Sequence, residues 1–551
     1  MIGVQPRVQV SGVPPGFSLN VAVGGQELFG LWWLKDGNLI EDDVHHGTTH
    51  TTNLVVTGIG PPDAGGYQVI VSNAFGMVTS QVVQVSIHCA DAAGTNPTPP
   101  YTSWTTAATN LQDAINAAPA GGIVLATNGT YASGGKVMFG NLTNRVALDK
   151  PMLVLGVSGF AHTVIEGSAG GSVATGLTAT RCAWLTNGAA LVGFTLRNGA
   201  TRSSGNSEEI SGGGFWGISS NAVVANCWFT NNAAWQGGGA AFGMVRNSVL
   251  VANTADEGGG AYQASLNNCT VVNNFCTTSP TSGGGTYQGK TRNCIVTGNY
   301  YLLFGFPNSI ANYTTGSDYS YCCTTPSISG AGNLNASPEF LDTAYHLPAV
   351  SLCRGAGSAA YAAGVDNDGE SWASPPSIGA DEVVDANLSG PLSLEIIVNT
   401  SPTLRLPRRN QVLTAVVTGR AARLDWDFGD GGATTNAGYL VRHTWTNAGD
   451  YTLTATAYNN DFPAGVSTNV VVRILPINQP TLGSAIVSNN TFRFTFDGQS
   501  AAKYTIQYAT NLAPPALWQN LYVIFSSPGG PTQFGDAAWT NSARFYRVLA
   551  E

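Results

Sequence analysis

The central part of the chain repeats one short pattern of apolar and polar residues. Four seven-residue copies each begin and end with asparagine and carry small or apolar side chains at their second and fourth positions: 226–232, 247–253, 268–274 and 293–299. Alternation with a period of two predicts strands with one buried face. The copies start 21, 21 and 25 residues apart, which is too short for a helical hairpin or a propeller blade. This period predicts one turn of a parallel β-helix per copy.

The aligned copies predict columns of like side chains along one axis. The second position should form an inward column made of Phe194, Cys227, Ser248, Cys269 and Cys294. The final position predicts an asparagine ladder, in which side-chain amides bond along the stack at a bend, made of Asn232, Asn253, Asn274 and Asn299. Asparagine also tolerates a left-handed backbone. Because each coil buries its face against its neighbours, stability should be roughly additive along the stack.

Residues 1–88 predict an antiparallel sandwich ahead of the repeats. Trp33 precedes a turn, and residues 63–67 read Asp-Ala-Gly-Gly-Tyr, which is the D-x-G-x-Y pattern of a tyrosine corner. The module resembles an immunoglobulin-like (Ig-like) domain whose inter-sheet disulfide is absent, because Val69 stands where the second cysteine would fall. Proline-rich residues 89–103 predict a linker. A β-helix is then predicted over 104–385, opened by a short helix that Asn110 caps and that shields the first coil.

Two further modules are expected after the β-helix. Residues 392–475 resemble a PKD (polycystic kidney disease type) sandwich, through the segments Trp426–Gly431, His443–Trp445 and Gly449–Tyr451. Residues 481–551 contain three alternating strands and resemble a fibronectin-like module.

Two segments of the β-helix region add to the resemblance. The helix and the following Gly129-Thr130-Tyr131 look like the N-terminal cap of pectin-lyase-like proteins. Residues 366–369 with 377–382 resemble the ending of bacterial surface β-helix proteins of the choice-of-anchor type. The resemblance implies an all-β, modular bacterial extracellular or surface protein, with a right-handed parallel β-helix between sandwiches.

Composition narrows the function classes. The 551 residues carry a net charge of −9 and only 10% charged residues, so no basic surface for nucleic acid is expected. No run reaches the roughly 18 apolar residues of a membrane span. Met1 opens no signal peptide, so we expect a secreted or cell-surface protein whose N-terminus is truncated. The nine cysteines lie between Cys89 and Cys353 and predict buried thiols; pairing of Cys269 with Cys294, or of Cys322 or Cys323 with Cys353, stays open. A monomer is expected.

Catalytic candidates are few. Polysaccharide hydrolases and lyases of the pectin-lyase-like fold carry motifs that this chain lacks, and the outward strand positions of the repeat hold no acid or base: Thr195, Trp228, Val249, Thr270 and Ile295. Asp256 and Glu257 precede a glycine triplet, and one hypothesis pairs them with Arg246 or Arg292 as a carboxylate and a base. The alternative is that these groups are solvated loop charges.

The aromatic residues predict a binding surface. Trp216, Tyr262 and Tyr287 follow glycine triplets at one offset, Ala241 interrupts the row, and Trp228 and Trp235 extend it. Such rings suit the apolar faces of sugars; the alternative is that they only cover the flank of the coil.

A calcium site is a further hypothesis. Asp366, Asp368 and Glu370 surround a tight glycine turn and offer oxygen ligands for calcium; the alternative is a plain turn.

The sequence therefore predicts a secreted or surface protein for binding or adhesion, with a polysaccharide or surface glycan as partner. A polysaccharide lyase or glycoside hydrolase with accessory modules is the alternative, and a structural stalk without a ligand is a third possibility. Fold alone links only loosely to function.

Overall fold

The computed structural model describes residues 2–12, 15–25, 30–43, 45–169, 176, 178–398, 406–489, 491–499, 502–524, 529–537 and 543–550. The chain divides into two compact units. The first comprises residues 1–338 and 351–384, and the second comprises residues 339–350 and 385–551. Nearly all regular structure is β, as the sequence predicted.

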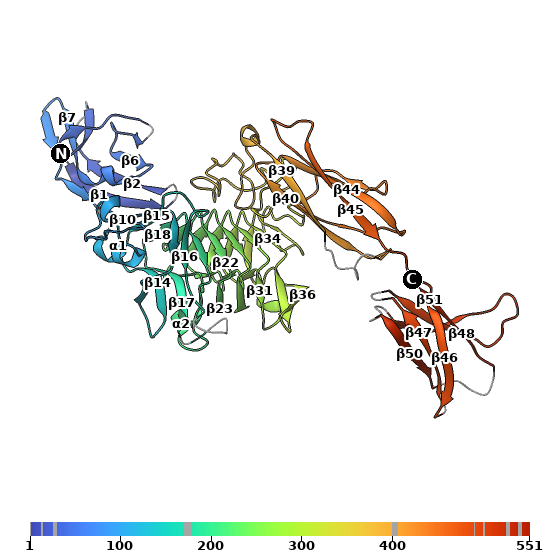
Figure 1. Ribbon diagram of the computed structural model, residues 1–551. Helices are drawn as coiled ribbons and strands as arrows, with labels where there is room; N and C mark the ends of the chain where they lie inside the picture. The colour runs from blue at the N-terminus through green and yellow to red at the C-terminus, as the bar shows by residue number, and fades with distance from the viewer. Residues whose placement is uncertain are drawn as a thin grey trace. The chain divides into compact units, whose positions relative to one another are not determined.

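Four sheets build the β-helix of the first unit, whose stacked strands run from light blue to yellow-green in Figure 1. The nine-stranded sheet contains β10 (Ile87–Ala90), β11 (Ile123–Ala126), β15 (Leu153–Gly156), β18 (Ala190–Val192), β21 (Val223–Ala225), β25 (Met244–Arg246), β29 (Ser265–Asn267), β33 (Lys290–Arg292) and β37 (Asp318–Ser320). The eight-stranded sheet contains β12 (Gly129–Tyr131), β16 (Thr163–Glu166), β19 (Thr195–Arg197), β22 (Trp228–Thr230), β26 (Val249–Val251), β30 (Thr270–Val272), β34 (Ile295–Thr297) and β38 (Cys323–Thr324).

The other two sheets complete each coil. The seven-stranded sheet contains β13 (Lys136–Val137), β14 (Thr143–Leu148), β17 (Thr180–Leu185), β20 (Phe215–Gly217), β24 (Ala240–Phe242), β28 (Ala261–Tyr262) and β32 (Thr286–Tyr287). The five-stranded sheet contains β23 (Ala233–Gln236), β27 (Thr254–Glu257), β31 (Phe275–Cys276), β35 (Tyr300–Leu303) and β36 (Phe306–Ile310). Pairing is parallel except for β13–β14 and β35–β36. A central coil passes through the nine-, eight-, five- and seven-stranded sheets in that order.

The asparagine ladder is present and fully buried. Asn232 Nδ2 donates to Asn253 Oδ1 at 2.9 Å, Asn253 to Asn274 at 2.9 Å, and Asn274 to Asn299 at 3.0 Å. Each Oδ1 also accepts the backbone N–H of the asparagine one coil earlier. The left-handed backbone falls one residue earlier than the ladder, at Asn231, Ala252, Asn273 and Gly298. The ladder asparagines are therefore selected for their amides.

The inward column of thiols also does more than fill space. Ser248 Oγ accepts the backbone N–H of Cys227 at 3.0 Å and donates to the carbonyl of Arg246 at 2.5 Å. Cys294 Sγ likewise accepts from Cys269 N at 3.3 Å and donates to Arg292 O at 3.0 Å. A small side chain with a hydrogen-bonding group is needed at this corner, which explains why serine and cysteine both occur there. All nine cysteines are free and buried.

The N-terminal sandwich packs directly on the first coils. Its sheets are β1 (Ile2–Gly12), β2 (Pro15–Val23), β6 (Asn53–Thr57) and β5 (His46–Gly47), and β4 (Asn38–Leu39), β3 (Gly30–Lys35), β7 (Gly65–Asn73) and β8 (Gly76–Thr79) with β9 (Val83–Val85). Tyr67 donates its hydroxyl to Asp63 O at 3.0 Å, as the tyrosine-corner motif predicted. The core of this sandwich, around Trp33, continues into Leu125 and Leu153 of the β-helix.

The β-helix begins earlier than the sequence suggested. β10 pairs with β11, so residues 87–90 form its first strand, partly inside the segment predicted as a linker. The expected helical cap is α1 (Leu111–Ala117), in which Asn110 Oδ1 accepts from Asp113 N at 3.0 Å. One further short helix, α2 (Ser207–Ile210), lies in an insertion between two coils.

Residues 351–384 contain no strand and run along the β-helix. A second column of asparagines, at the corner between the nine- and eight-stranded sheets, bonds to backbone carbonyls of this segment. Asn247 Nδ2 donates to Val365 O at 2.7 Å, and Asn293 Nδ2 donates to Ser358 O at 2.8 Å. The predicted ending, residues 366–369 and 377–382, also lies along the side of the coils, where Asn226 donates to Asp366 O and Asn268 donates to Ser377 O.

The second unit contains two antiparallel sandwiches. One has sheets β39 (Ser393–Val398), β40 (Gln411–Thr418) and β43 (Leu440–His443), and β42 (Ala433–Thr434), β41 (Arg423–Asp427), β44 (Gly449–Tyr458) and β45 (Val466–Ile474). Trp426 and Trp445 are buried in its core. The other has β46 (Thr481–Ser488), β47 (Thr491–Gly498) and β50 (Gly530–Asp536), and β49 (Gln519–Ile524), β48 (Tyr504–Ala509) and β51 (Phe545–Ala550).

Candidate functional site

Aromatic rings run along the outside of the seven-stranded sheet. Trp184 aligns with Trp216, and Tyr262 aligns with Tyr287, one coil apart in each case. Each pair is stacked, with ring centroids 5.8 Å apart for the tryptophans and 5.1 Å for the tyrosines. Phe242 fills the gap that Ala241 leaves, because its ring meets Trp216 at 6.1 Å and Tyr262 at 5.8 Å. We call these five rings the aromatic row.

The two ends of the aromatic row differ in exposure. Trp184 and Trp216 are buried, at 4% and 6% exposure, in a small cluster with Met138 and Phe242. Phe242 and the two tyrosines are half-buried. Rings stacked face to face cover each other's faces, so a ligand meets mainly edges and hydroxyl groups there. Trp216 is thus a packing residue, and the accessible part of the row lies at Phe242, Tyr262 and Tyr287.

The chain bends inward where the five-stranded sheet meets the seven-stranded sheet. A Cβ on Gly237 would lie 2.2 Å from Ala240 O and 3.0 Å from the Cβ of Ala241, which is buried in a cluster with Trp216. Gly237 and Gly258 have φ of +67° and +64°, a conformation that favours glycine. This tight bend explains the first glycine of each triplet and brings the edges of two outer faces together.

Polar side chains line the same bend. Gln236 Nε2 donates to Glu257 Oε2 at 3.0 Å, and Ser211 Oγ donates to Gln236 Oε1 at 3.2 Å. Burial and the nearby Glu257 carboxylate raise the pKa of Tyr262, against a hydrogen bond from Gln236 that lowers it. The Tyr262 hydroxyl therefore lies beside this amide and carboxylate.

Amides continue the polar line past Tyr262. Gln263 Nε2 donates to Tyr262 Oη at 3.3 Å and to Gln288 Oε1 at 3.1 Å. Both glutamines are exposed. Donors and acceptors thus repeat from coil to coil beside the rings.

Trp235 is the most exposed ring near this bend. Its side chain is 46% exposed, and it comes from β23 immediately before Gln236. The register of β23 and β27 places Asp256 opposite Trp235, and Thr277 donates its hydroxyl to Asp256. We use the name aromatic corner for Trp235, Gln236, Phe242, Asp256, Glu257, Tyr262, Gln263, Tyr287 and Gln288.

The predicted pairing of acids with arginines is wrong. Asp256 and Glu257 lie in the five-stranded sheet, whereas Arg246 and Arg292 lie in the nine-stranded sheet. These two sheets are not adjacent in a coil, because the eight-stranded sheet lies between them on one side and the seven-stranded sheet on the other. Arg292 instead pairs with Asp318 at 2.6 Å. Burial lowers the pKa of Arg246. A short repeat assigns side chains to columns, but the number of sheets per coil decides which columns face one another.

Trp228 also belongs to a different face from Trp216. It lies on β22 of the eight-stranded sheet and stacks on Phe160 with centroids 5.8 Å apart. Phe160 lines a cavity of about 590 Å³ together with Ile59, Asn226 and Asn367. Trp228 therefore does not extend the aromatic row.

Among the predicted calcium ligands, the Asp366 carboxylate is engaged by the backbone of its own turn. Asp366 is buried, and its Oδ1 accepts the N–H groups of Asp368 and Glu370 at 2.9 and 2.7 Å. Its Oδ2 accepts the N–H of Glu382 at 2.8 Å. Burial raises the pKa of Asp366 to about 8, although these hydrogen bonds act to lower it. Three backbone amides engage this carboxylate, so its role in the structure is to hold the turn.

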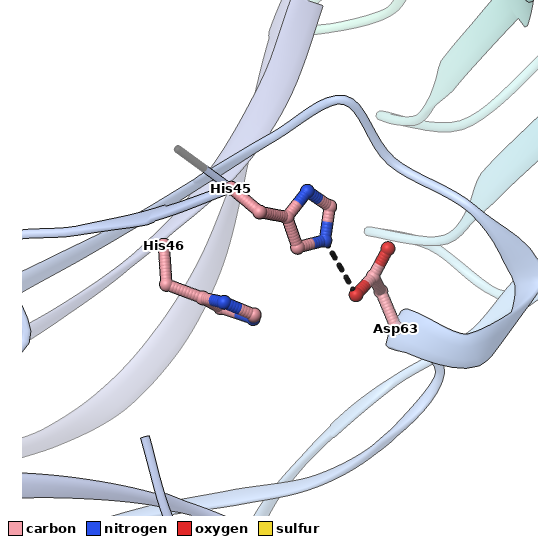
Figure 2. Close-up of side chains that lie close together, drawn as sticks. All are labelled: His45, His46 and Asp63. Carbon is pink, nitrogen blue, oxygen red and sulfur yellow. Dashed lines mark hydrogen bonds and ion pairs between the residues drawn. The ribbon is translucent and has the colours of Figure 1, made fainter. Parts of the chain in front are cut away.

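Sequence reasoning missed several residues. Phe242 was missed because it lies one residue after the aligned position. Trp184 was missed because an insertion separates its coil from the next and breaks the period. A group of possible metal ligands, His45, His46 and Asp63, also went unnoticed (Figure 2). The adjacent histidines and the tyrosine-corner aspartate were the available signals.

Comparisons with known proteins place one module. The PKD domain family matches residues 395–472, where the structure has the sandwich of β39 to β45. The chain is a modular β-helix protein that carries a PKD domain. No curated protein is significantly similar to it in sequence.

Solved structures resemble the chain only distantly. Pectate lyase Pel9A shares 14% identity, covering 54% of this chain and 96% of that one, with a TM-score of 0.29. A structure described as a carbohydrate-binding module of the β-sandwich superfamily shares 13% identity over 29% of this chain and 96% of that one, at a TM-score of 0.15. Bacteroides uniformis β-glucuronidase 3 shares 8% identity, covering 100% of this chain and 76% of that one, with a TM-score of 0.19. These structures are too dissimilar to indicate the function of this chain. The functional proposal therefore rests on the chain's own side chains.

Proposed function

We propose that this protein is secreted or displayed at a cell surface and binds a polysaccharide or surface glycan along the aromatic corner. The observation that carries the proposal is that accessible rings and glutamine amides repeat in successive coils beside a bend that carries a carboxylate. Sugars offer apolar C–H faces together with many hydroxyl groups, and a ring beside a hydrogen-bonding group matches both.

The repeat distance supports an extended ligand. Successive coils of a parallel stack lie about 4.8 Å apart, which is close to the length of one hexose unit in an extended chain. A polysaccharide lying along the stack would therefore meet one set of groups per coil. Trp235 supplies an exposed ring, and Gln263 and Gln288 supply amide groups from two successive coils.

Two features of the chain as a whole concern its partners. Within the described part of the chain, no helix is long and apolar enough to cross a membrane. The net charge of −9 disfavours nucleic acid as the partner. We infer that the sandwiches act as spacers or accessory modules and that the chain binds as a monomer.

Affinity electrophoresis in gels containing soluble polysaccharides tests the proposal. A panel of neutral and uronate polysaccharides should contain at least one that retards the full chain. Trp235→Ala should weaken that binding about tenfold, because loss of one ring contact costs on the order of 1 kcal/mol or more. Trp104→Ala is the matched control, since Trp104 is 37% exposed and lies in the N-terminal cap region. Equal retardation of both variants would overturn the assignment of the site.

A glycan-cleaving enzyme is the second candidate, because Asp256 and Glu257 lie at the same bend as the rings. The same polysaccharides should then yield an unsaturated product with ultraviolet absorbance, or new reducing ends, over time. Glu257→Gln would remove that activity, because it takes away the carboxylate and keeps the size of the side chain. Binding without product formation by the unsubstituted protein supports the first candidate.

A further inference from the structure

Three side chains with metal-binding atoms meet in the N-terminal sandwich. His45 and His46 enter β5, and Asp63 ends the short 3₁₀ helix Pro61–Asp63 at the tyrosine corner. One ligand atom from each residue lies within 4.8 Å of the others. Figure 2 shows both imidazole rings close to the Asp63 carboxylate, with His45 Nε2 directed at Asp63 Oδ1, 2.8 Å away.

The chain fixes these side chains from behind. Asp63 Oδ2 accepts the N–H of Gly60 at 2.7 Å, which leaves Oδ1 directed at the histidines. The Asp43 carboxylate accepts the N–H of His45 at 2.7 Å and lies 3.3 Å from His46 Nδ1. A carboxylate on one ring nitrogen sets the histidine tautomer and presents the other nitrogen as a ligand, as in many metal sites.

The other nitrogen of His46 is buried and has no hydrogen-bond partner in the structure. A buried polar atom without a partner costs about 1–3 kcal/mol, so an arrangement that leaves one beside two further ligand atoms requires a reason. A bound cation supplies that reason because it accepts the lone pair of the nitrogen.

We propose that His45, His46 and Asp63 bind a divalent transition metal ion, with Zn²⁺ as the favoured ion. Two imidazoles and one carboxylate are ligands that zinc prefers, and calcium would require more oxygen atoms. Zinc ligands at about 2.0 Å in a tetrahedron lie about 3.3 Å apart, so the His45–Asp63 contact opens only slightly. The imidazoles are 27% and 18% exposed, which leaves room for water as the fourth ligand.

The site would join two segments that only the fold brings together. His45 directly precedes β5 and His46 begins it, whereas Asp63 belongs to the tyrosine corner, so one ion cross-links residues 18 positions apart. Binding to the folded state alone raises stability with ion concentration. Zinc should therefore raise the unfolding temperature of this sandwich.

Chelator competition with the full-length protein, stripped of metal, tests the proposal. We expect one zinc ion to bind per chain, and Co²⁺ in its place to give the visible absorption of a tetrahedral N/O site. His46→Ala should weaken zinc binding at least a hundredfold. His162→Ala is the matched control, because His162 is an exposed histidine that is not one of the three ligands, and the zinc affinity of this variant should be unchanged.

A milder variant separates ligand loss from misfolding. Asp43→Asn keeps all three ligands and an oxygen that accepts the backbone N–H groups of His45 and His46, but it removes the negative charge beside His46 Nδ1. We expect it to weaken binding about tenfold or more, with an unchanged circular dichroism spectrum. The proposal fails if the unsubstituted chain binds no zinc above the level of His46→Ala. In that case His45 and Asp63 form a simple hydrogen-bonded pair.

Discussion

Removal of one rung of the asparagine ladder should unravel the β-helix locally. The Asn253 side chain takes part in four hydrogen bonds and is fully buried. Its Oδ1 accepts from Asn232 N at 3.1 Å and from Asn232 Nδ2 at 2.9 Å. Its Nδ2 donates to Phe229 O at 3.0 Å and to Asn274 Oδ1 at 2.9 Å. At about 1 kcal/mol net per bond, Asn253→Ala should lower local stability by about 3–4 kcal/mol.

Native-state hydrogen exchange is the suitable assay, because a chain of several modules does not unfold in a single two-state step. A loss of about 3 kcal/mol speeds exchange more than a hundredfold when exchange follows opening. We expect this effect in peptides that cover β22, β26 and β30 and expect little change in the second unit. Stability in stacked repeats passes mainly between neighbouring coils.

Asn221→Ala provides the control, because the Asn221 side chain is exposed at a turn of the same β-helix. Its exchange should match that of the unsubstituted protein within about threefold, as for most surface changes. If Asn253→Ala also stays within that range, the ladder does not stabilise the stack and the reasoning is wrong.

Three further outcomes are expected. Cys294→Ala should cost about 1–2 kcal/mol of local stability by hydrogen exchange, while Cys294→Ser should cost less because hydroxyl and thiol make the same bonds in this column. The Cys323 and Cys353 thiols contact each other, so mild oxidation should cross-link them, seen by mass spectrometry as a loss of two hydrogens. Burial acts to raise the pKa of Asp430, but His443, 2.8 Å away, holds it below its usual range. The PKD sandwich should therefore lose stability in chemical denaturation as pH falls from about 4 through that lowered pKa, and Asp430→Asn should flatten this part of the profile.

The repeating part of the fold was predictable because its interactions are periodic. Equal spacing places equal side chains one above another, so Asn232 and Asn253 could be assigned to a ladder from sequence alone. Local motifs were predictable for a similar reason, since the bond from Tyr67 to the carbonyl of Asp63 spans only four residues. Both features depend on short separations along the chain.

The candidate site was predictable only in part, because it depends on which residues of each coil belong to which sheet. The sequence placed Tyr262 and Tyr287 in one row but gave no angle between strands, so it joined Trp228 to that row and matched Asp256 with arginines on a distant sheet. An insertion moved Trp184 out of the period. The His45–Asp63 contact joins two loops of a sandwich, and no repeat or motif records such a meeting.

The geometry of the aromatic corner favours binding over cleavage. Hydrolysis of a glycosidic bond usually requires two carboxyl groups that flank one bond. Asp256 and Glu257 are consecutive residues of β27, and each carboxylate already accepts a hydrogen bond, from Thr277 and Gln236 respectively. A stack of coils repeats similar groups and so offers many weak, equivalent contacts. Such contacts suit retention of a long polymer, whereas catalysis requires two different groups at a single place.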